Sequence, residues 1–331
     1  MKVTVLGAGA WGTTFGQVLA DAGNDVTMWA IEPQIVEGIR DHHHNAVRLP
    51  SVEKLPDNMT ATGDRAEAVQ DASIIVVAIA AQFARVALAE FKSLIPNDAI
   101  VVSLMKGIER GTKKRMDEVV RETLDLPAER FAAVSGPNLS KEIAARQPAA
   151  TVVACSDIDN ARKVAAACTT SYFKAFVSTD VIGLEMCGSL KNVVALAVGM
   201  ARGAGYGENT AAMIETRGLA ELTALGKAAG ADPKTFAGLA GVGDLTATCG
   251  SPLSRNYTFG ANLGKGLSVE EATKVSNGVA EGVPTTDAVV ALGDELGVST
   301  PLAYAMSRVL NEGISCSEML EQLFSSEITE E

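Results

Sequence analysis

The pattern of hydrophobic and polar residues divides the chain into two parts with different predicted structures. Up to about Thr179, short apolar runs alternate with amphipathic stretches. The apolar runs predict strands at residues 3–6, 24–30, 73–80, 99–105, 131–134, 151–154 and 174–177. The amphipathic stretches predict helices at residues 10–22, 82–94 and 112–124, and polar sequence predicts an irregular segment at 41–64. Strands that alternate with helices indicate a doubly wound α/β sheet with right-handed crossovers.

After Thr179 the strand-like runs stop, and alanine, leucine and glycine recur at helical spacing. This pattern predicts helices at residues 182–200, 209–229, 286–296, 301–311 and 317–325, with further helix starts at Asp232 and Ser268. The small residues in the first of these helices should let it pack closely against its neighbours. We therefore predict an α/β domain at residues 1–179 and an all-helical domain at residues 180–331, joined directly by that helix.

Composition and charge narrow the class of protein. The 331 residues are 47% hydrophobic and 21% charged, which is typical of a globular protein with ample core. A formal net charge of −12 argues against a nucleic-acid partner, because phosphate-binding surfaces need basic residues in excess. The five cysteines are scattered and lack C-x-x-C spacing, which favours a reduced, cytoplasmic protein.

The sequence predicts neither a targeting segment nor a metal site. The N-terminus lacks the separate apolar segment and cleavage site of a signal peptide, and no uninterrupted apolar stretch approaches the ~20 residues of a membrane span. The three histidines, His42 to His44, are consecutive and have no cysteine close by in the sequence. We expect a polar loop there and no metal site.

The first dozen residues carry a glycine-rich turn. Gly7, Gly9 and Gly12 follow a predicted strand, and Ala10 and Trp11 open a predicted helix. This context is typical of a Rossmann-like dinucleotide site, where backbone N–H groups and the helix N-terminus approach a pyrophosphate. The alternative is an ordinary strand-to-helix turn, since the glycine motif alone is weak.

One acidic residue lies where such a fold binds the adenosine ribose. Glu32 stands twenty residues beyond Gly12, just past the second predicted strand. A carboxylate there would bind ribose hydroxyls and repel the extra phosphate of NADP, which favours NAD. A solvated loop glutamate is an equally good interpretation of Glu32.

Four polar clusters in apolar or glycine-rich surroundings could carry chemistry. They centre on Lys106 at a predicted strand end, Lys191 within a small-residue helix, Asp244 framed by glycines, and Arg255 beside Asn256. Taken singly, Lys191 could equally be a surface lysine, and the Arg255 cluster favours a polar loop. Together they suit the reduction of a phosphate-bearing ketone. Lys191 would donate the proton, Lys106 would lower its pKa and polarise the carbonyl, Asp244 would orient Lys191, and Arg255 with Asn256 would hold an anionic group.

Over essentially its full length the sequence resembles the bacterial NAD(P)-dependent glycerol-3-phosphate dehydrogenases. The resemblance rests on seven motifs in order, at residues 7–12, 106–107, 135–137, 190–192, 241–245, 254–256 and 281–282. It implies reversible hydride transfer between NAD(P)H and dihydroxyacetone phosphate, which gives sn-glycerol 3-phosphate for glycerophospholipid synthesis. A homodimer is a further expectation from the family.

The resemblance also implies roles for individual residues. Lys191 would be the general acid and base, and Lys106 would touch both substrate and cofactor. The substrate site would comprise Lys106, Gly136, Asn138, Lys191, Asn192, Asp244, Ser254, Arg255 and Asn256. The cofactor site would comprise Gly7, Gly9, Ala10, Trp11, Gly12, Glu32, Lys106, Ser140, Arg255, Val279 and Glu281.

Three places depart from the family pattern. Ile31 and Glu32 stand where the family often has histidine or arginine, so we expect NADH to be at least as good a cofactor as NADPH. Asn138 and Ser140 replace the usual small hydroxyl residue and alanine, and the residues before Lys106 follow the common pattern loosely. Two alternative functions stay open: a related hydroxyacid or ketopantoate-type reductase, and a non-catalytic protein that senses dinucleotides.

Overall fold

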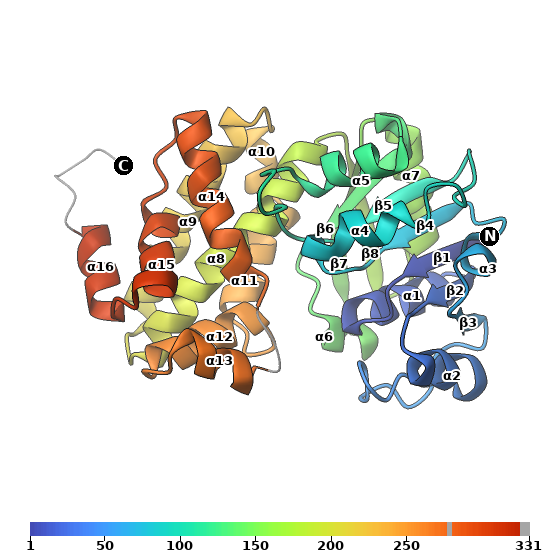
Figure 1. Cartoon of the computed structure of the whole chain (residues 1–331), viewed down its shortest axis with the longest axis horizontal. Helices are drawn as coiled ribbons and strands as arrows, with labels where there is room; N and C mark the ends of the chain where they lie inside the picture. The colour runs from blue at the N-terminus through green and yellow to red at the C-terminus, as the bar shows by residue number, and fades with distance from the viewer. Residues whose placement is uncertain (277–279, 325–331) are drawn as a thin grey trace. The chain divides into compact units, whose positions relative to one another are not determined.

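The computed structural model describes residues 1–276 and 280–324, which form two compact units (Figure 1). The first unit comprises Met1–Lys106 and Arg115–Leu184, and the second comprises Gly107–Lys114 and the chain from Glu185 onward. The units divide within one helix, after Leu184, whereas the predicted domain division precedes that helix at residue 179. The assignment of Gly107–Lys114 to the second unit has no counterpart in the sequence pattern.

The first unit is built on an eight-stranded sheet with the order β3-β2-β1-β4-β5-β6-β7-β8. All neighbouring strands are parallel except β6 and β7, which are antiparallel. The strands are β1 Lys2–Leu6, β2 Asp25–Trp29, β3 Met59–Thr62, β4 Ile74–Val77, β5 Ile100–Ser103, β6 Phe131–Ser135, β7 Ala149–Cys155 and β8 Phe173–Ser178. The predicted Rossmann-like class is confirmed.

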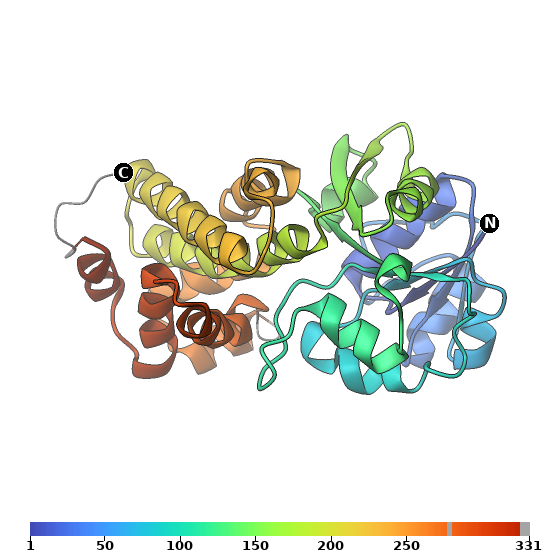
Figure 2. The same cartoon turned by 90° about the horizontal axis from the view of Figure 1, so that it is seen from above.

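Helices cover both faces of this sheet. On one face lie α1 (Ala10–Asp21) and α7 (Ile158–Cys168), and on the other α4 (Ala84–Ala89) and α5 (Met116–Leu124) (Figure 2). Every residue of β4 is buried, as expected for a central parallel strand. The remaining helical segments are α2 Pro33–His42, α3 Arg65–Val69, α6 Ser140–Ala144 and the 3₁₀ turns Ala81–Phe83 and Ala128–Arg130. Because β1, β2, β4 and β5 are parallel, their carboxyl ends lie at the same edge of the sheet.

Several local predictions in this unit are wrong. The helix predicted at 112–124 begins only at Met116, because Gly111 and Lys113 adopt positive φ in the preceding segment. The helix predicted at 82–94 reduces to a 3₁₀ turn and the short α4. The segment predicted to be irregular contains β3, whose sequence Met-Thr-Ala-Thr lacks an apolar run but pairs with β2. His42 ends α2 rather than lying in a loop, and His43 follows it in the left-handed conformation.

The second unit is helical, as predicted, and α8 (Val181–Gly203) lies at its core. Over the described residues α8 is the one helix long and apolar enough to cross a membrane, but 89% of its apolar window is buried inside the protein. The other helices are α9 Glu208–Ala228, α10 Pro233–Phe236, α11 Asp244–Cys249, α12 Arg255–Gly264, α13 Val269–Val275, α14 Gly282–Leu296, α15 Pro301–Glu312 and α16 Cys316–Phe324. The predicted final helix residue, 325, lies outside the described residues.

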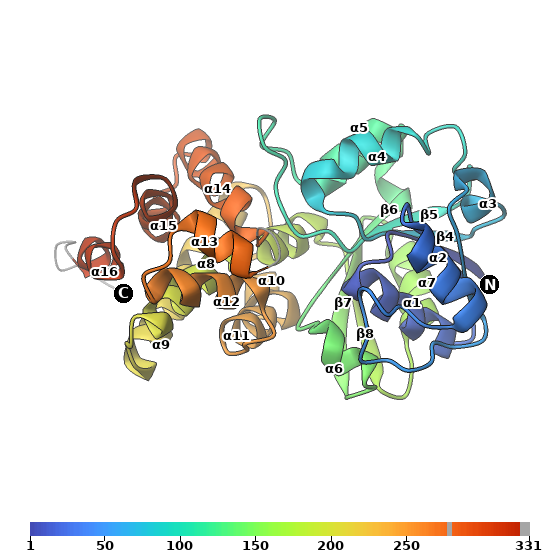
Figure 3. The same cartoon turned by 60° about the horizontal axis from the view of Figure 1, so that its bottom comes forward.

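Small residues bring α8 and α12 into close contact (Figure 3). A Cβ added at Gly199 would lie 2.1 Å from the carbonyl oxygen of Tyr257, and one at Gly260 would lie 2.1 Å from that of Leu196. No side chain larger than hydrogen fits at either position without displacing backbone. The predicted close packing of this helix is therefore confirmed. It fixes α12 against the C-terminal part of α8, between Leu196 and Gly203.

Candidate active site and cofactor site

The glycine-rich turn has the local geometry that a pyrophosphate site requires. Gly7 has φ of +112°, and a Cβ there would lie 2.6 Å from the carbonyl oxygen of Ala78 on the neighbouring strand end. A Cβ at Gly12 would lie 2.1 Å from the carbonyl oxygen of Gly7, so the helix can approach the strand only with glycine there. Gly9 is the N-cap of α1, and a Cβ added to it would meet nothing within 4 Å. The turn therefore packs closely against neighbouring backbone at Gly7 and Gly12 and leaves open space at Gly9, which suits a bound dinucleotide.

The first turn of α1 supplies the donors for such a ligand. Helix geometry leaves the N–H groups of Ala10, Trp11 and Gly12 without an intrahelical acceptor, and the first helical bond runs from Thr13 N to Gly9 O at 2.9 Å. The Trp11 ring packs against Phe15 with centroids 5.6 Å apart. These residues thus offer backbone N–H groups and a partly exposed aromatic face at the carboxyl edge of β1.

Glu32 is not a solitary loop carboxylate. It is the N-cap residue of α2 by backbone conformation, and Arg48 Nη2 donates to Glu32 Oε1 at 3.1 Å. Both side chains are partly exposed, at 34% for Glu32 and 50% for Arg48. Ile31 beside them is 73% exposed. A cation therefore accompanies the acid after β2, and sequence reasoning missed it because Arg48 lies in a polar segment with no motif.

Lys106 follows β5 at the carboxyl edge of the sheet, as predicted. Its Nζ donates to the carbonyl oxygen of Gly136, at 3.5 Å. Gly136 itself tolerates little more than hydrogen, because a Cβ there would lie 3.0 Å from Thr151 Cα. The lysine and the loop after β6 are thus held together within the first unit.

The side chain of Asn138 is hydrogen-bonded to strand β7. Its Nδ2 donates to Ala150 O at 3.1 Å, and its Oδ1 accepts from Thr151 Oγ1 at 2.9 Å. In this structure the side chain therefore anchors the loop to β7. Ser140 is the first residue of α6, and its carbonyl oxygen accepts from Thr14 Oγ1 of α1 at 3.3 Å. Both residues tie the loop to neighbouring elements.

Lys191 is a buried lysine on α8, with a relative exposure of 5%. Its Nζ donates to Asp244 Oδ1 and to Thr248 Oγ1, the latter at 2.7 Å. Thr248 Oγ1 in turn donates to the same carboxylate oxygen at 3.2 Å. A lysine so far from water needs an anionic partner to stay charged, and Asp244 provides it at 2% exposure. The expected pairing of Lys191 with Asp244 is present.

Local structure places Asp244 and Thr248 on the same side. Residues Leu239–Gly243 form one π-helical turn that runs directly into α11, and Asp244 opens that helix. The four-residue spacing then brings Thr248 beneath Asp244. The sequence pointed to the acid through its flanking glycines, but nothing marked Thr248 as a partner of Lys191. The four-residue spacing that places Thr248 beside Asp244 can be recognised only once the position of α11 is known.

Ser254, Arg255 and Asn256 start a helix rather than a loop. Ser254 is the N-cap of α12, and its Oγ accepts from Tyr257 N at 3.3 Å. Asn256 joins two other helices: its Nδ2 donates to Asn192 Oδ1 at 2.9 Å, and its Oδ1 accepts from Gly282 N at 2.8 Å. The predicted substrate residues Asn192 and Asn256 therefore form one buried amide pair.

Arg255 lies close enough to Glu281 to influence it. Burial raises the pKa of Glu281, and the positive charge of Arg255 partly opposes this shift. These two predicted cofactor residues are therefore neighbours within the second unit. Val279, the third predicted cofactor residue in this region, lies outside the described residues.

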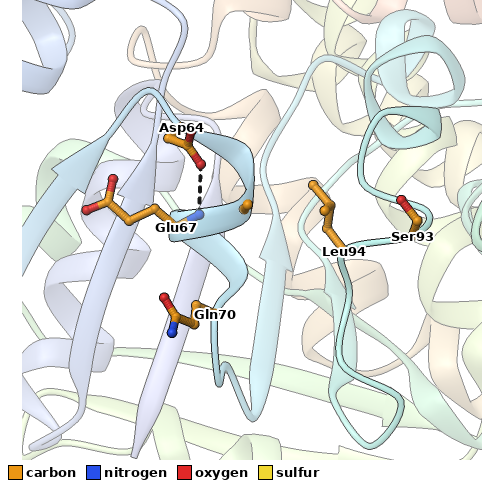
Figure 4. A pocket seen from close by; sticks show the side chains of 6 residues that line it. Asp64, Glu67, Gln70, Ser93 and Leu94 are labelled. Atoms are coloured by element: carbon orange, nitrogen blue, oxygen red, sulfur yellow. Dashed lines mark hydrogen bonds between the residues drawn. The ribbon is translucent and has the colours of Figure 1, made fainter.

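Two hollows in the described surface do not contain these residues. One, of about 660 Å³, is lined by Asp64, Ala66, Glu67, Gln70, Ser93 and Leu94 (Figure 4). Its two carboxylates have local roles, since Asp64 caps α3 by accepting from Glu67 N at 2.9 Å and Glu67 Oε2 accepts from Thr62 Oγ1 at 2.5 Å. The other, of about 610 Å³, lies along α9. Neither presents the groups that the predicted chemistry needs.

Comparison with known proteins identifies the family. The profile described as NAD-dependent glycerol-3-phosphate dehydrogenase N-terminus matches residues 2–161, and the profile of the C-terminus matches residues 180–321. The chain belongs to this family. The family that the motifs indicated is confirmed, and with it a dependence on NAD(P) and a place among the dehydrogenases.

Curated relatives and solved structures agree with this assignment. Glycerol-3-phosphate dehydrogenase [NAD(P)+] of Bifidobacterium longum (strain NCC 2705) is 87% identical over 330 residues, which are 100% of this chain and 99% of the relative. The Streptomyces coelicolor enzyme of the same name is 48% identical over 98% of this chain and 96% of its own. The crystal structure of glycerol-3-phosphate dehydrogenase from Coxiella burnetii has a TM-score of 0.92 at 31% identity, covering 98% of this chain and 99% of that one.

A ketopantoate reductase structure from Ralstonia eutropha shares the fold alone. Its TM-score is 0.62 at 19% identity, covering 97% of this chain and 100% of that one. This likeness explains why the dinucleotide turn and the helical second half could not separate the two kinds of reductase by themselves.

Proposed function

We propose that the chain is an NAD(P)-dependent sn-glycerol-3-phosphate dehydrogenase that interconverts dihydroxyacetone phosphate and sn-glycerol 3-phosphate. The observation that carries the proposal is the buried Lys191–Asp244–Thr248 cluster in a member of this family. We further propose that it acts in the cytoplasm as a homodimer and supplies glycerophospholipid synthesis. Residues 1–179 would bind the dinucleotide, and residues 180–331 would bind the substrate.

In the proposed reaction Lys191 is the general acid and base. NAD(P)H, when bound, would supply the hydride to the substrate's central carbon, and NAD(P)+ would accept it in the reverse direction. Lys191 Nζ then gives its proton to the ketone oxygen, which becomes the hydroxyl, and in the reverse direction it accepts that proton. Asp244 and Thr248 hold the ammonium in one orientation, so the proton is presented along a fixed direction.

The remaining predicted residues bind and polarise the substrate. Lys106 would polarise the carbonyl, since it follows β5 and is held by Gly136 O. The guanidinium of Arg255 would clamp the phosphate through paired N–H donors. The side chain of Asn256 donates a hydrogen bond to that of Asn192, and this pair would fix the geometry around Lys191.

The residues after β2 would set the choice of cofactor. Glu32 can accept from the ribose hydroxyls of NAD, and Arg48 can pair with the 2′-phosphate of NADP once it leaves Glu32. Because the pair offers a partner to either cofactor, we propose that both are used and that NADH is at least as good as NADPH.

A comparison of substrates tests the proposed function. The purified chain is mixed with NADH or NADPH, and the loss of reduced cofactor is followed by absorbance on adding dihydroxyacetone phosphate, dihydroxyacetone or ketopantoate. We expect turnover with dihydroxyacetone phosphate and little with the other two. Preference for ketopantoate would favour the alternative reductase, and binding of dinucleotide with no turnover of any ketone would favour a sensor.

A further inference from the structure

A single buried amide links the glycine-rich turn to the loop that carries Arg48. Asn45 is 1% exposed and lies in the segment between α2 and β3. Its Nδ2 donates to Ala8 O at 3.0 Å and to Thr13 Oγ1 at 2.9 Å, while its Oδ1 accepts from Arg48 N at 3.1 Å. The amide therefore makes three of the four hydrogen bonds open to it.

The partners of Asn45 fix the direction of its amide. Ala8 O can only accept, so it must face the amino group, and Arg48 N can only donate, so it must face the amide oxygen. An aspartate could not replace the two donated bonds, and an alanine would replace none. Among side chains of this size and shape, only asparagine can make all three hydrogen bonds.

These bonds reach both places where the dinucleotide is proposed to bind. Ala8 lies between Gly7 and Gly9 in the open turn, and Thr13 makes the first helical bond of α1. On the other side, Arg48 pairs with Glu32 after β2. The pyrophosphate donors and the adenosine-side charge pair thus share one buried connection, although they come from different parts of the sequence.

We propose that Asn45 is a positioning residue for the dinucleotide, which sets the glycine-rich turn and the Arg48 loop at the spacing the cofactor needs. The proposal rests on the proposed cofactor use of this unit. Tight binding requires the protein to contact the pyrophosphate and the ribose at the same time. A displacement of either site therefore weakens the contacts at both. Asn45 itself does not contact the cofactor.

The structure offers a matched control at the other end of α1. Asn24 is also buried, at 4% exposure, and its Nδ2 donates to two carbonyl oxygens, those of Leu19 at 2.7 Å and Ala167 at 2.8 Å. Asn24→Ala therefore removes a similar buried amide without touching the turn. Thermal unfolding without cofactor should show comparable losses of stability for Asn24→Ala and Asn45→Ala.

The test is equilibrium binding of NADH and NADPH, followed by cofactor fluorescence without substrate. We expect Asn45→Ala to raise both dissociation constants by roughly 5- to 100-fold, the range for a lost buried hydrogen-bonding group, and to move their ratio toward one. Asn24→Ala should leave both constants and the ratio unchanged. Thr13→Val, which removes only the hydroxyl acceptor, should give a smaller increase and serves if Asn45→Ala does not fold.

The results separate this proposal from the proposed function. If Asn45→Ala and Thr13→Val bind both cofactors as the unmodified chain does, or no more weakly than Asn24→Ala, the positioning role is wrong. If the unmodified chain binds neither cofactor, the proposed function itself is wrong and this proposal falls with it.

Discussion

Glu221 on α9 should make the stability of the second unit depend on pH. Its carboxylate accepts from Leu302 N at 2.8 Å and from Ala303 N at 3.2 Å, the first turn of α15. Burial nevertheless raises the pKa of Glu221 from 4.5 to about 7, and the two backbone bonds only partly oppose this. The folded chain therefore holds a proton on this carboxyl at pH values where the unfolded chain has released it.

The sign and size of the effect follow from this pKa. A carboxyl whose pKa is raised on folding contributes stability below its unfolded pKa, and that contribution is lost as the pH rises through the folded pKa. With values of 4.5 and about 7, Glu221 contributes about 2 kcal/mol at pH 5.5 and almost nothing at about pH 8.5. Below pH 5.5 the chain approaches its isoelectric point of about 4.9, so the experiment stays above that pH.

Glu221→Gln isolates this contribution. Glutamine has the shape of the protonated acid and does not titrate in this range. We expect the free energy of urea unfolding of the unmodified chain, minus that of the variant, to fall by about 2 kcal/mol between about pH 5.5 and 8.5. Circular dichroism follows the loss of helix at each pH.

A second variant serves as the pH-independent control. Glu318 on α16 is exposed, and hydrogen bonds from Ser315 lower the pKa of its carboxyl. Glu318→Gln should therefore give a difference that stays constant between about pH 5.5 and 8.5, because this carboxyl is ionised in both the folded and the unfolded chain throughout that range. A difference for Glu221→Gln that is independent of pH, or that grows with pH, would show that burial does not raise the pKa of Glu221.

Three further substitutions test the proposed active site. Thr248→Val should lower kcat by about tenfold with little change in KM, because Lys191 loses one of the hydrogen bonds that orient it. Thr246 is exposed on the same helix, so Thr246→Val is the control. Equal effects of the two variants on kcat would count against the orienting role of Thr248. Arg255→Ala should raise KM for dihydroxyacetone phosphate by about tenfold or more through a lost phosphate contact; an unchanged KM would remove the proposed clamp. Arg48→Ala should weaken NADPH binding about tenfold more than NADH binding, measured by fluorescence titration, and equal losses would place the 2′-phosphate elsewhere.

The sequence predicts the architecture well because the architecture follows from local patterns. Runs such as 73–80 mark buried parallel strands, and helical spacing after Thr179 marks the second unit. Elements without such a pattern were missed. β3 is a polar four-residue strand that exists because it pairs with β2, and α12 begins in a stretch that resembles a loop.

Individual site residues were predictable where the chemistry gives them an unusual sequence context. A lysine within a helix of small apolar residues and an acid directly after a glycine pair singled out Lys191 and Asp244. Thr248, Arg48 and Asn45 carry no such mark, since their roles arise from partners distant in the sequence. The hydrogen bonds that anchor the Asn138 side chain were equally unforeseeable, because its partners lie on β7.

The proton-donating role of Lys191 in the reduction of dihydroxyacetone phosphate is the central claim. Its most direct test compares the unmodified chain with Lys191→Ala in a single assay, where NADH oxidation is followed on adding dihydroxyacetone phosphate and NADH binding is measured by fluorescence. We predict turnover by the unmodified chain, a loss of about 10²- to 10⁴-fold in kcat for Lys191→Ala, and the same dissociation constant for NADH in both. Turnover by Lys191→Ala at the unmodified rate would contradict the acid–base role, and no turnover by the unmodified chain would contradict the function itself.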